Sequence, residues 1–168
     1  QFLELGCGHG LYAIAACQVN PSLKATVYQP PGSSLLQENI RRFGMETRIT
    51  ACSNLTEIPD ATSDIVLASQ FLYPVQGNLK EVVGQISAIL RGGGLFVSNH
   101  WFAHDAEGTG SQGLYELELG MHNRYEQMSD PEFFTRICSE AGLSFFQTGM
   151  MRSRYGQSTV QMATRGGK

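Results

Sequence analysis

Three glycines at alternate positions follow a short apolar segment near the start of the chain, in the stretch LELGCGHGLYAIA at residues 3–15. The residues before them, FLEL, have the pattern of a buried strand, and Leu11, Ile14 and Val19 after them have helical spacing. Because glycine accepts positive φ and carries no side chain, a ligand can approach such a turn closely. The stretch therefore predicts a strand–turn–helix junction that admits an anionic or nucleotide-like ligand.

Short apolar strands alternate with helical patterns along the rest of the chain, which is typical of a parallel sheet with helices on both faces. Later strands are expected at residues 25–29, 47–52, 64–69 and 95–99. Helices are expected from a cap at Ser33 or Ser34 through Phe43, at residues 78–90, and from a cap at Asp130 to a stop at Gly142. Residues 103–113 predict a loop, residues 114–125 a further helix, and residues 143–151 and 158–164 a closing antiparallel hairpin.

Composition limits the class of protein. With 168 residues, 42% of them hydrophobic, the chain can bury one good-sized core, and residues 1–168 are expected to form one domain. A net charge of −3 provides no basic face for nucleic acid, so a small-molecule substrate is the expected partner. No apolar run is long enough for a membrane span. Four scattered cysteines suggest reduced thiols in a cytoplasmic protein.

The strand pattern begins already at Phe2, whereas most domains begin with a few polar, poorly ordered residues. The chain is therefore expected to be a fragment that lacks an upstream segment of its parent protein. A homodimer formed through that missing segment is one possibility.

The glycine spacing argues against a dinucleotide site. The dinucleotide fingerprint is G-x-G-x-x-G, and its third glycine would fall at Leu11 in this chain. An NAD-dependent oxidoreductase is therefore disfavoured, while a tight turn without any ligand stays open as an alternative.

ELGCGHG resembles instead the acidic-x-Gly-x-Gly-x-Gly motif of class I S-adenosylmethionine-dependent methyltransferases. PDATSDIVLAS is similar to that family's fourth-strand segment, and LRGGGLFVSN to its glycine turn into strand five. QENIRRFGMETRITA, EAGLSFF and the closing hairpin resemble more narrowly the catalytic domain of small-molecule O-methyltransferases, which follows an N-terminal dimerisation domain. The resemblance implies a Rossmann-like α/β fold, with a seven-stranded sheet of order 3-2-1-4-5-7-6 and strand seven antiparallel.

The resemblance also implies a site for S-adenosylmethionine. The glycine turn would hold the aminoacyl end of the cofactor, and Glu4 would supply negative charge near its ammonium. Gln29 stands where the family usually has an acidic residue on the ribose, and Ser53 and Asn54 stand where it commonly has an aspartate facing the adenine amine. The implied cofactor-binding residues are Glu4, Gly6, Cys7, Gly8, Gly10, Gln29, Pro30, Ser53, Asn54, Ser69 and Gln70.

Three residues are candidates for the catalytic base. Tyr73 aligns with the histidine base of plant-like O-methyltransferases, and His100 and His104 lie just beyond strand five, where either could be a base or a loop histidine with local hydrogen bonds. A metal site made of His100, His104, Asp105 and His122 is disfavoured, because magnesium prefers clustered carboxylates. No metal is expected.

The expected function is methyl transfer from S-adenosylmethionine to a small molecule, and the O-methyltransferase resemblance favours oxygen as the acceptor atom. Holding the acceptor in line with an already activated methyl group could supply most of the catalysis. The alternative is a degenerate domain without catalysis that serves as a structural or interaction module. Gln29, Asn54 and Tyr73 argue for that alternative.

Overall fold

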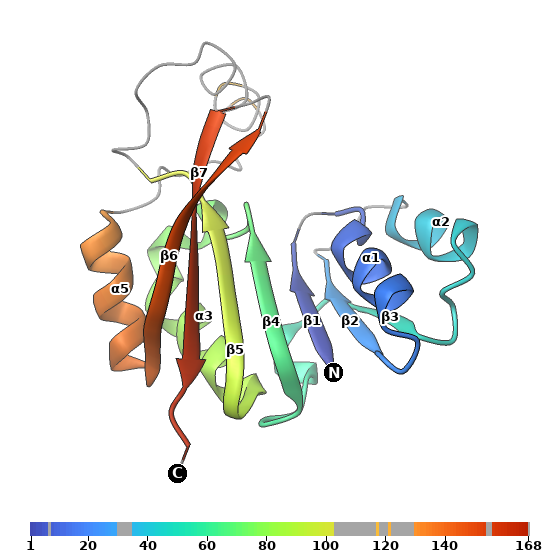
Figure 1. Cartoon of the computed structure of the whole chain (residues 1–168), viewed down its shortest axis with the longest axis horizontal. Coiled ribbons are helices and arrows are strands. Elements are labelled where there is room, and N and C mark those ends of the chain that lie inside the picture. The colour runs from blue at the N-terminus through green and yellow to red at the C-terminus, as the bar shows by residue number, and fades with distance from the viewer. Residues whose placement is uncertain are drawn as a thin grey trace.

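The computed structural model describes residues 1–6, 8–29, 35–102, 117, 121, 130–153 and 156–167. A seven-stranded sheet of order β3-β2-β1-β4-β5-β7-β6 runs through the molecule (Figure 1). The strands are β1 (Phe2–Leu5), β2 (Ala25–Tyr28), β3 (Ile49–Cys52), β4 (Ser63–Ser69), β5 (Leu90–His100), β6 (Leu143–Ser153) and β7 (Gly156–Arg165). Strands β1 to β5 pair in parallel, whereas β7 is antiparallel to β5 and to β6. The predicted strand order and the closing hairpin are confirmed.

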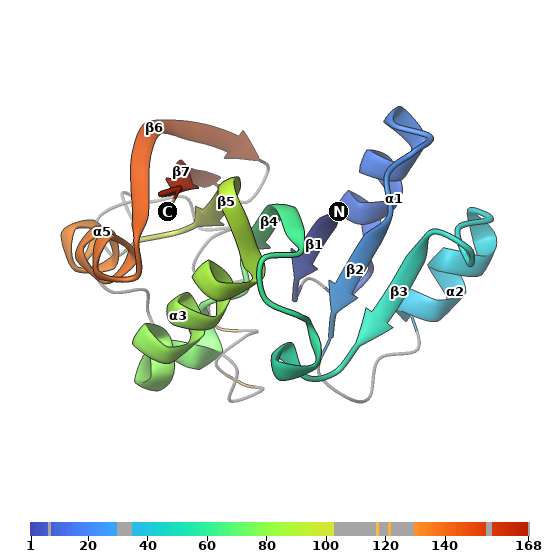
Figure 2. The ribbon, with the colours of Figure 1, turned by 90° about the horizontal axis from the view of Figure 1, so that it is seen from below.

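Helices cover both faces of the sheet, as Figure 2 shows from below. The helices are α1 (Leu11–Val19), α2 (Leu35–Arg42), α3 (Leu79–Ile89) and α5 (Pro131–Glu140), with short 3₁₀ segments η1 (Leu55–Glu57) and η2 (Tyr73–Asn78). Apolar residues of α1 and α2 form one core with β1, β2 and β3, and those of α3 and α5 form a second core with the opposite face. Burial of these two apolar layers is the main source of stability.

The predicted stop of α2 and both predicted ends of α5 are confirmed. Asp130 caps α5, because its Oδ1 accepts a hydrogen bond of 2.7 Å from the backbone N–H of Glu132, and Pro131 occupies the first helical position. Gly44 follows α2 with φ of +64°, and Gly142 follows α5 with φ of +81°. The expected caps Ser33 and Ser34 lie outside the described residues.

The predicted start of β5 was wrong. The strand begins at Leu90, which the sequence pattern assigns to the preceding helix, and it runs through the glycine-rich stretch that the pattern predicts as a turn. A register shift absorbs the extra residues, because Ser63 pairs with Leu90 while Ile65 pairs with Leu95. Gly93, with φ of +76°, supplies the bend within this stretch. The predicted loop 103–113 and, apart from Leu117 and Met121, the predicted helix 114–125 lie outside the described residues.

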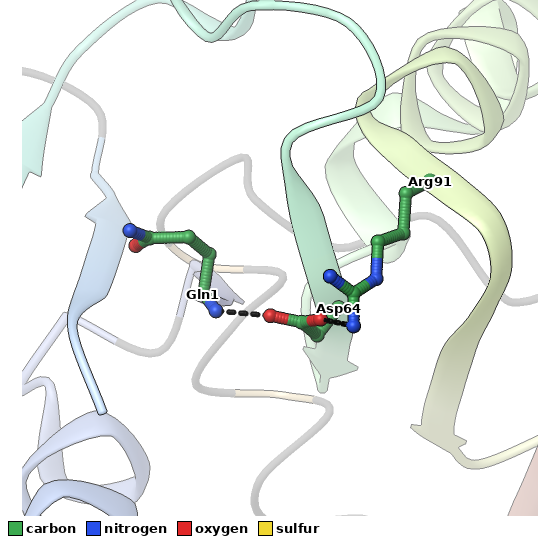
Figure 3. A network of polar contacts seen from close by, with 3 residues as sticks. All are labelled: Gln1, Asp64 and Arg91. Atoms are coloured by element: carbon green, nitrogen blue, oxygen red, sulfur yellow. Dashed lines mark hydrogen bonds and ion pairs between the residues drawn. The ribbon is translucent and has the colours of Figure 1, made fainter. Parts of the chain in front are cut away.

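An ion-pair network joins the amino ends of three neighbouring strands (Figure 3). The Asp64 carboxylate in β4 accepts from the amino group of Gln1 and from the guanidinium of Arg91 in β5. The hydrogen bond from the Gln1 amino group, together with the charge of Arg91, lowers the pKa of Asp64. These contacts lie at the amino ends of the strands, opposite the edge that carries the candidate site.

Candidate cofactor and active site

The predicted cofactor-binding residues meet at the carboxyl edge of the parallel strands, toward which β4 and β5 point in Figure 1. In open α/β sheets this edge is where ligands bind, at the point where the strand order reverses. Here the reversal falls between β1 and β4, which are neighbours in the sheet. The glycine turn follows β1, Gln29 follows β2, Ser53 and Asn54 follow β3, and Ser69 ends β4. Cys7, Pro30 and His104 lie outside the described residues.

The glycines of the turn have different surroundings, although Gly6, Gly8 and Gly10 all have positive φ, between +68° and +80°. A Cβ atom on Gly6 would lie 1.9 Å from Cδ2 of Phe71, and one on Gly10 would lie 2.4 Å from Cδ1 of Leu36. A Cβ atom on Gly8 would meet nothing within 4 Å. Gly6 and Gly10 therefore leave room for neighbouring side chains of the protein, whereas among the described residues none fills the space beside Gly8, which a ligand could enter.

Glu4 is held against the first turn of α1. Its side chain is 1% exposed, and its Oε2 accepts a hydrogen bond of 2.7 Å from the backbone N–H of Ala13. No side chain caps this helix at Gly10, so the carboxylate takes over part of that role, next to the positive end of the helix dipole. This buried contact ties the end of β1 to the first turn of α1 and so holds the glycine turn between them in place.

Gln29 and Asn54 occupy the ends of β2 and β3. Gln29 is 9% exposed, and its backbone N–H donates to the carbonyl of Cys52 at 2.9 Å. Oδ1 of Asn54 accepts from the backbone N–H of Thr56 at 3.0 Å and caps η1. With that oxygen in use, the Asn54 amide NH₂ is the part best suited to a ligand, and it is a donor.

The last residues of β5 hold the segment that follows β4. Nε2 of His100 accepts hydrogen bonds from the backbone N–H groups of Phe71 and Leu72, at 3.3 and 3.2 Å. An imidazole nitrogen that accepts carries no proton, so the proton of this neutral ring is on Nδ1. Complete burial lowers the pKa of His100 to about 3.

The residues on either side of His100 make similar links. The carbonyl of Asn99 accepts from the backbone N–H of Gln70 at 2.9 Å, and its Nδ2 donates to Oγ of Ser69 at 3.3 Å. The backbone N–H of Trp101 donates to the Tyr73 hydroxyl at 2.7 Å, and that hydroxyl donates to Oε1 of Gln70. Gln70 itself has φ of +52°, a strained value for a residue with a side chain, which these links maintain.

Two of the three candidate bases are therefore deep in the fold. Tyr73 is 1% exposed and His100 is fully buried, and the Tyr73 hydroxyl and the His100 Nε2 are engaged within the chain. A general base has to reach the proton that it removes, directly or through one water. Because both side chains are buried and bonded within the chain, neither is placed to take a proton from a ligand in this conformation.

The buried imidazole predicts a pH dependence of stability. The pKa of His100 in the folded protein, about 3, lies below the ordinary value of 6.5. Between these two pH values only the unfolded chain takes up the proton. The contribution of His100 to the free energy of unfolding is therefore complete above about pH 6.5 and is lost as the pH falls toward 3. Between about pH 7 and pH 5, the free energy of unfolding should fall by about 2 kcal/mol more in the unmodified protein than in His100→Gln. Chemical denaturation at both pH values measures this, and equal losses in the two proteins would contradict it.

The described residues include no group of three His, Cys, Asp or Glu side chains that could hold a metal. Of the four residues considered for such a site, only His100 is described.

Cys17, Cys52 and Cys138 are free thiols, and burial raises the pKa of Cys52, with a contribution from Glu57, to about 11. In the described part of the chain, no helix has the length and apolar character that a membrane span requires.

The strand order, the antiparallel β7 and the glycine turn after β1 together define a Rossmann-like class I methyltransferase fold. The family model described as a methyltransferase domain matches residues 3–98, which is more than half of the chain. The chain belongs to this methyltransferase domain family. A comparison with curated proteins finds no match.

Solved structures with this fold resemble the chain at low sequence identity. An O-methyltransferase family protein from Burkholderia thailandensis is 16% identical, with a TM-score of 0.79 over 99% of this chain and 51% of that protein. An O-methyltransferase family 2 protein from Planctomyces limnophilus, in complex with apigenin, is 18% identical, with a TM-score of 0.75 over 97% and 50%. A geranyl diphosphate methyltransferase in complex with GPP and sinefungin is 15% identical, with a TM-score of 0.74 over 98% and 70%. This chain thus spans about half the length of the first two proteins.

Phe71 is the site residue that the sequence did not indicate. Its ring lies over Gly6 and meets the ring of Tyr28 edge to face, with 5.6 Å between the centroids. An aromatic residue two positions after β4 was its only signal, and the same signal marks ordinary core residues. The contact joins positions 65 residues apart, so local sequence patterns do not reveal it.

Proposed function

We propose that the chain is the catalytic domain of an S-adenosylmethionine-dependent methyltransferase that acts on a small molecule, with oxygen as the acceptor atom. One observation carries the proposal: at the end of β1, in the glycine turn of a methyltransferase domain, side chains cover Gly6 and Gly10, whereas no described residue would lie within 4 Å of a Cβ atom on Gly8. The sinefungin complex of the geranyl diphosphate methyltransferase, which has the same fold, supports a cofactor of this class, since sinefungin is an S-adenosylmethionine analogue.

The residues around the turn fit the methionine end of such a cofactor. Gly8 lets the backbone approach it, and Glu4 fixes the turn while adding negative charge beneath it. Gln29 can accept one hydrogen bond from a ribose hydroxyl, and the Asn54 amide can donate to a ring nitrogen of adenine. The cofactor supplies an electrophilic methyl group on its sulfonium, so the task left to the chain is to hold and align the reactants.

The acceptor is proposed to be an acidic oxygen, such as a phenol or a carboxylate. Tyr73 and His100 are buried with their oxygen and Nε2 atoms engaged, so neither is placed to remove a proton from a weakly acidic alcohol. An acceptor that ionises near neutral pH needs no strong base. His104 is retained as the alternative base from the sequence. The O-methyltransferase neighbours support oxygen as the acceptor atom.

Replacing Gln29 by glutamate tests the cofactor site. A carboxylate can accept from both ribose hydroxyls with charge assistance, whereas the amide oxygen offers a weaker contact. Gln29→Glu should therefore lower the Kd for S-adenosylhomocysteine by about five- to thirtyfold in calorimetric titration. Gln29→Leu is the matched control and should weaken binding.

The same titration separates an enzyme from a degenerate module. Binding by the unmodified chain that tightens in Gln29→Glu supports the proposal, and turnover with a panel of phenols and carboxylic acids then identifies the acceptor. If neither protein binds S-adenosylmethionine or its demethylated product at millimolar concentration, the proposed function fails. The structural or interaction module would then be the better explanation of the altered residues.

A further inference from the structure

We propose that His100 is a positioning residue for the cofactor pocket, which acts by holding the ring of Phe71 against the glycine turn. The inference rests on the proposed function, because the pocket concerned is the one that would bind S-adenosylmethionine. It gives His100 a role different from the general base that its place beyond strand five suggested.

The first step in this chain of contacts is the imidazole itself. His100 ends β5, and its side chain lies on the same face of the strand as Phe96, within the core that α3 and α5 cover. The ring of Phe134 in α5 and that of Tyr73 lie 6.4 and 5.5 Å from the imidazole, centroid to centroid. These neighbours keep water away from Nε2, and a hydrogen bond made in such surroundings is stronger than one exposed to solvent.

The second step is the backbone that Nε2 holds. The N–H groups of Phe71 and Leu72 both point at this one nitrogen, at the point where the chain leaves β4. Gln70, just before them, has φ of +52°. A turn that combines a strained residue with two buried N–H groups needs an acceptor, and without one each buried N–H would cost free energy. Nε2 of His100 is an acceptor that the structure provides for both groups.

The third step is the contact between the ring of Phe71 and the glycine turn. Phe71 is 6% exposed, and its ring occupies the position that a side chain on residue 6 would take. It also contacts the ring of Tyr28, the residue before Gln29. The backbone N–H of Gly6 donates to the carbonyl of Tyr28 at 3.1 Å. Phe71 therefore braces the glycine turn and the end of β2, the two parts of the site proposed to hold the methionine end and the ribose.

A matched pair of amide substitutions tests the role of Nε2. The side-chain oxygen of glutamine can reach the position of Nε2, whereas asparagine is one methylene shorter and reaches only the position of Nδ1. His100→Asn should raise the Kd for S-adenosylhomocysteine about tenfold, and His100→Gln should stay within about twofold of the unmodified protein. Hydrogen exchange should show the amides of Phe71 and Leu72 exchanging faster in His100→Asn but not in His100→Gln.

A double-mutant cycle shows whether the effect passes through Phe71 or through general loss of stability. In a Phe71→Leu background, His100→Asn should change the Kd by less than about twofold, because the ring that His100 positions is already absent. Titrations are made at a temperature where thermal unfolding shows every variant folded. Equal, additive losses in both backgrounds would overturn the inference.

The remaining outcomes separate this inference from the proposed function. If the unmodified chain binds S-adenosylhomocysteine and His100→Asn binds it equally well, the positioning role is overturned and the proposed function stands. If the unmodified chain does not bind, the proposed function and the positioning role fail together. A turnover loss in His100→Gln with unchanged Kd would restore His100 as a catalytic base.

Discussion

Gly8→Val is expected to abolish cofactor binding, with a rise of at least about a hundredfold in the Kd for S-adenosylhomocysteine. Gly8 has φ of +76°, and a Cβ atom there would have no atom of the described residues within 4 Å. A branched side chain in that space would stand where the methionine end of the cofactor is proposed to lie. Calorimetric titration of the variant measures the loss directly.

The control for this experiment is Gly142→Val, in the turn between α5 and β6. Gly142 has φ of +81°, and a Cβ atom on it would likewise have no described atom within 4 Å. The substitution therefore causes the same kind of backbone strain far from the proposed cofactor site. Both variants should lose stability, but only Gly8→Val should lose binding. Unchanged binding in Gly8→Val would show that the cofactor does not bind beside the glycine turn. The proposed function would then lose the observation on which it rests.

Much of the fold could be predicted because its signals are local. Each buried parallel strand is a short apolar run, and caps such as Asp130 and stops such as Gly44 mark the ends of the helices. The family motif then supplied the strand order, which periodicity alone does not determine. The start of β5 was missed because three successive glycines indicate a turn, whereas here they form a bulged part of the strand.

The site was predictable only in outline. The motif located the glycine turn, yet it could not show that Gly6 admits Phe71 while Gly8 faces open space, since that division depends on side chains from distant elements. The sequence places His100 just beyond strand five, as a candidate base or a loop histidine, because that strand is expected to end at Asn99. Continuing the alternation of Phe96 and Ser98 by two residues would have placed it on the buried face.

Gly6→Ala is expected to destabilise the fold by about 3 kcal/mol, which is more than the same change at Gly8 should cost. Both glycines have similar positive φ, so the cost of placing alanine in a left-handed conformation, about 1 kcal/mol, applies to each. At Gly6 the new methyl group would also lie 1.9 Å from the Phe71 ring, which is buried and cannot move without losing its packing.

Chemical denaturation of Gly6→Ala, Gly8→Ala and Phe71→Ala, together with the double variant at positions 6 and 71, would separate the two costs. Once the ring has been removed, Gly6→Ala should cost only the backbone term of about 1 kcal/mol, so the two substitutions should be coupled by about 2 kcal/mol. A cost at Gly6 equal to that at Gly8 would show that the ring moves away freely. Phe71 would then not brace the turn, and the inference about His100 would lose its last step.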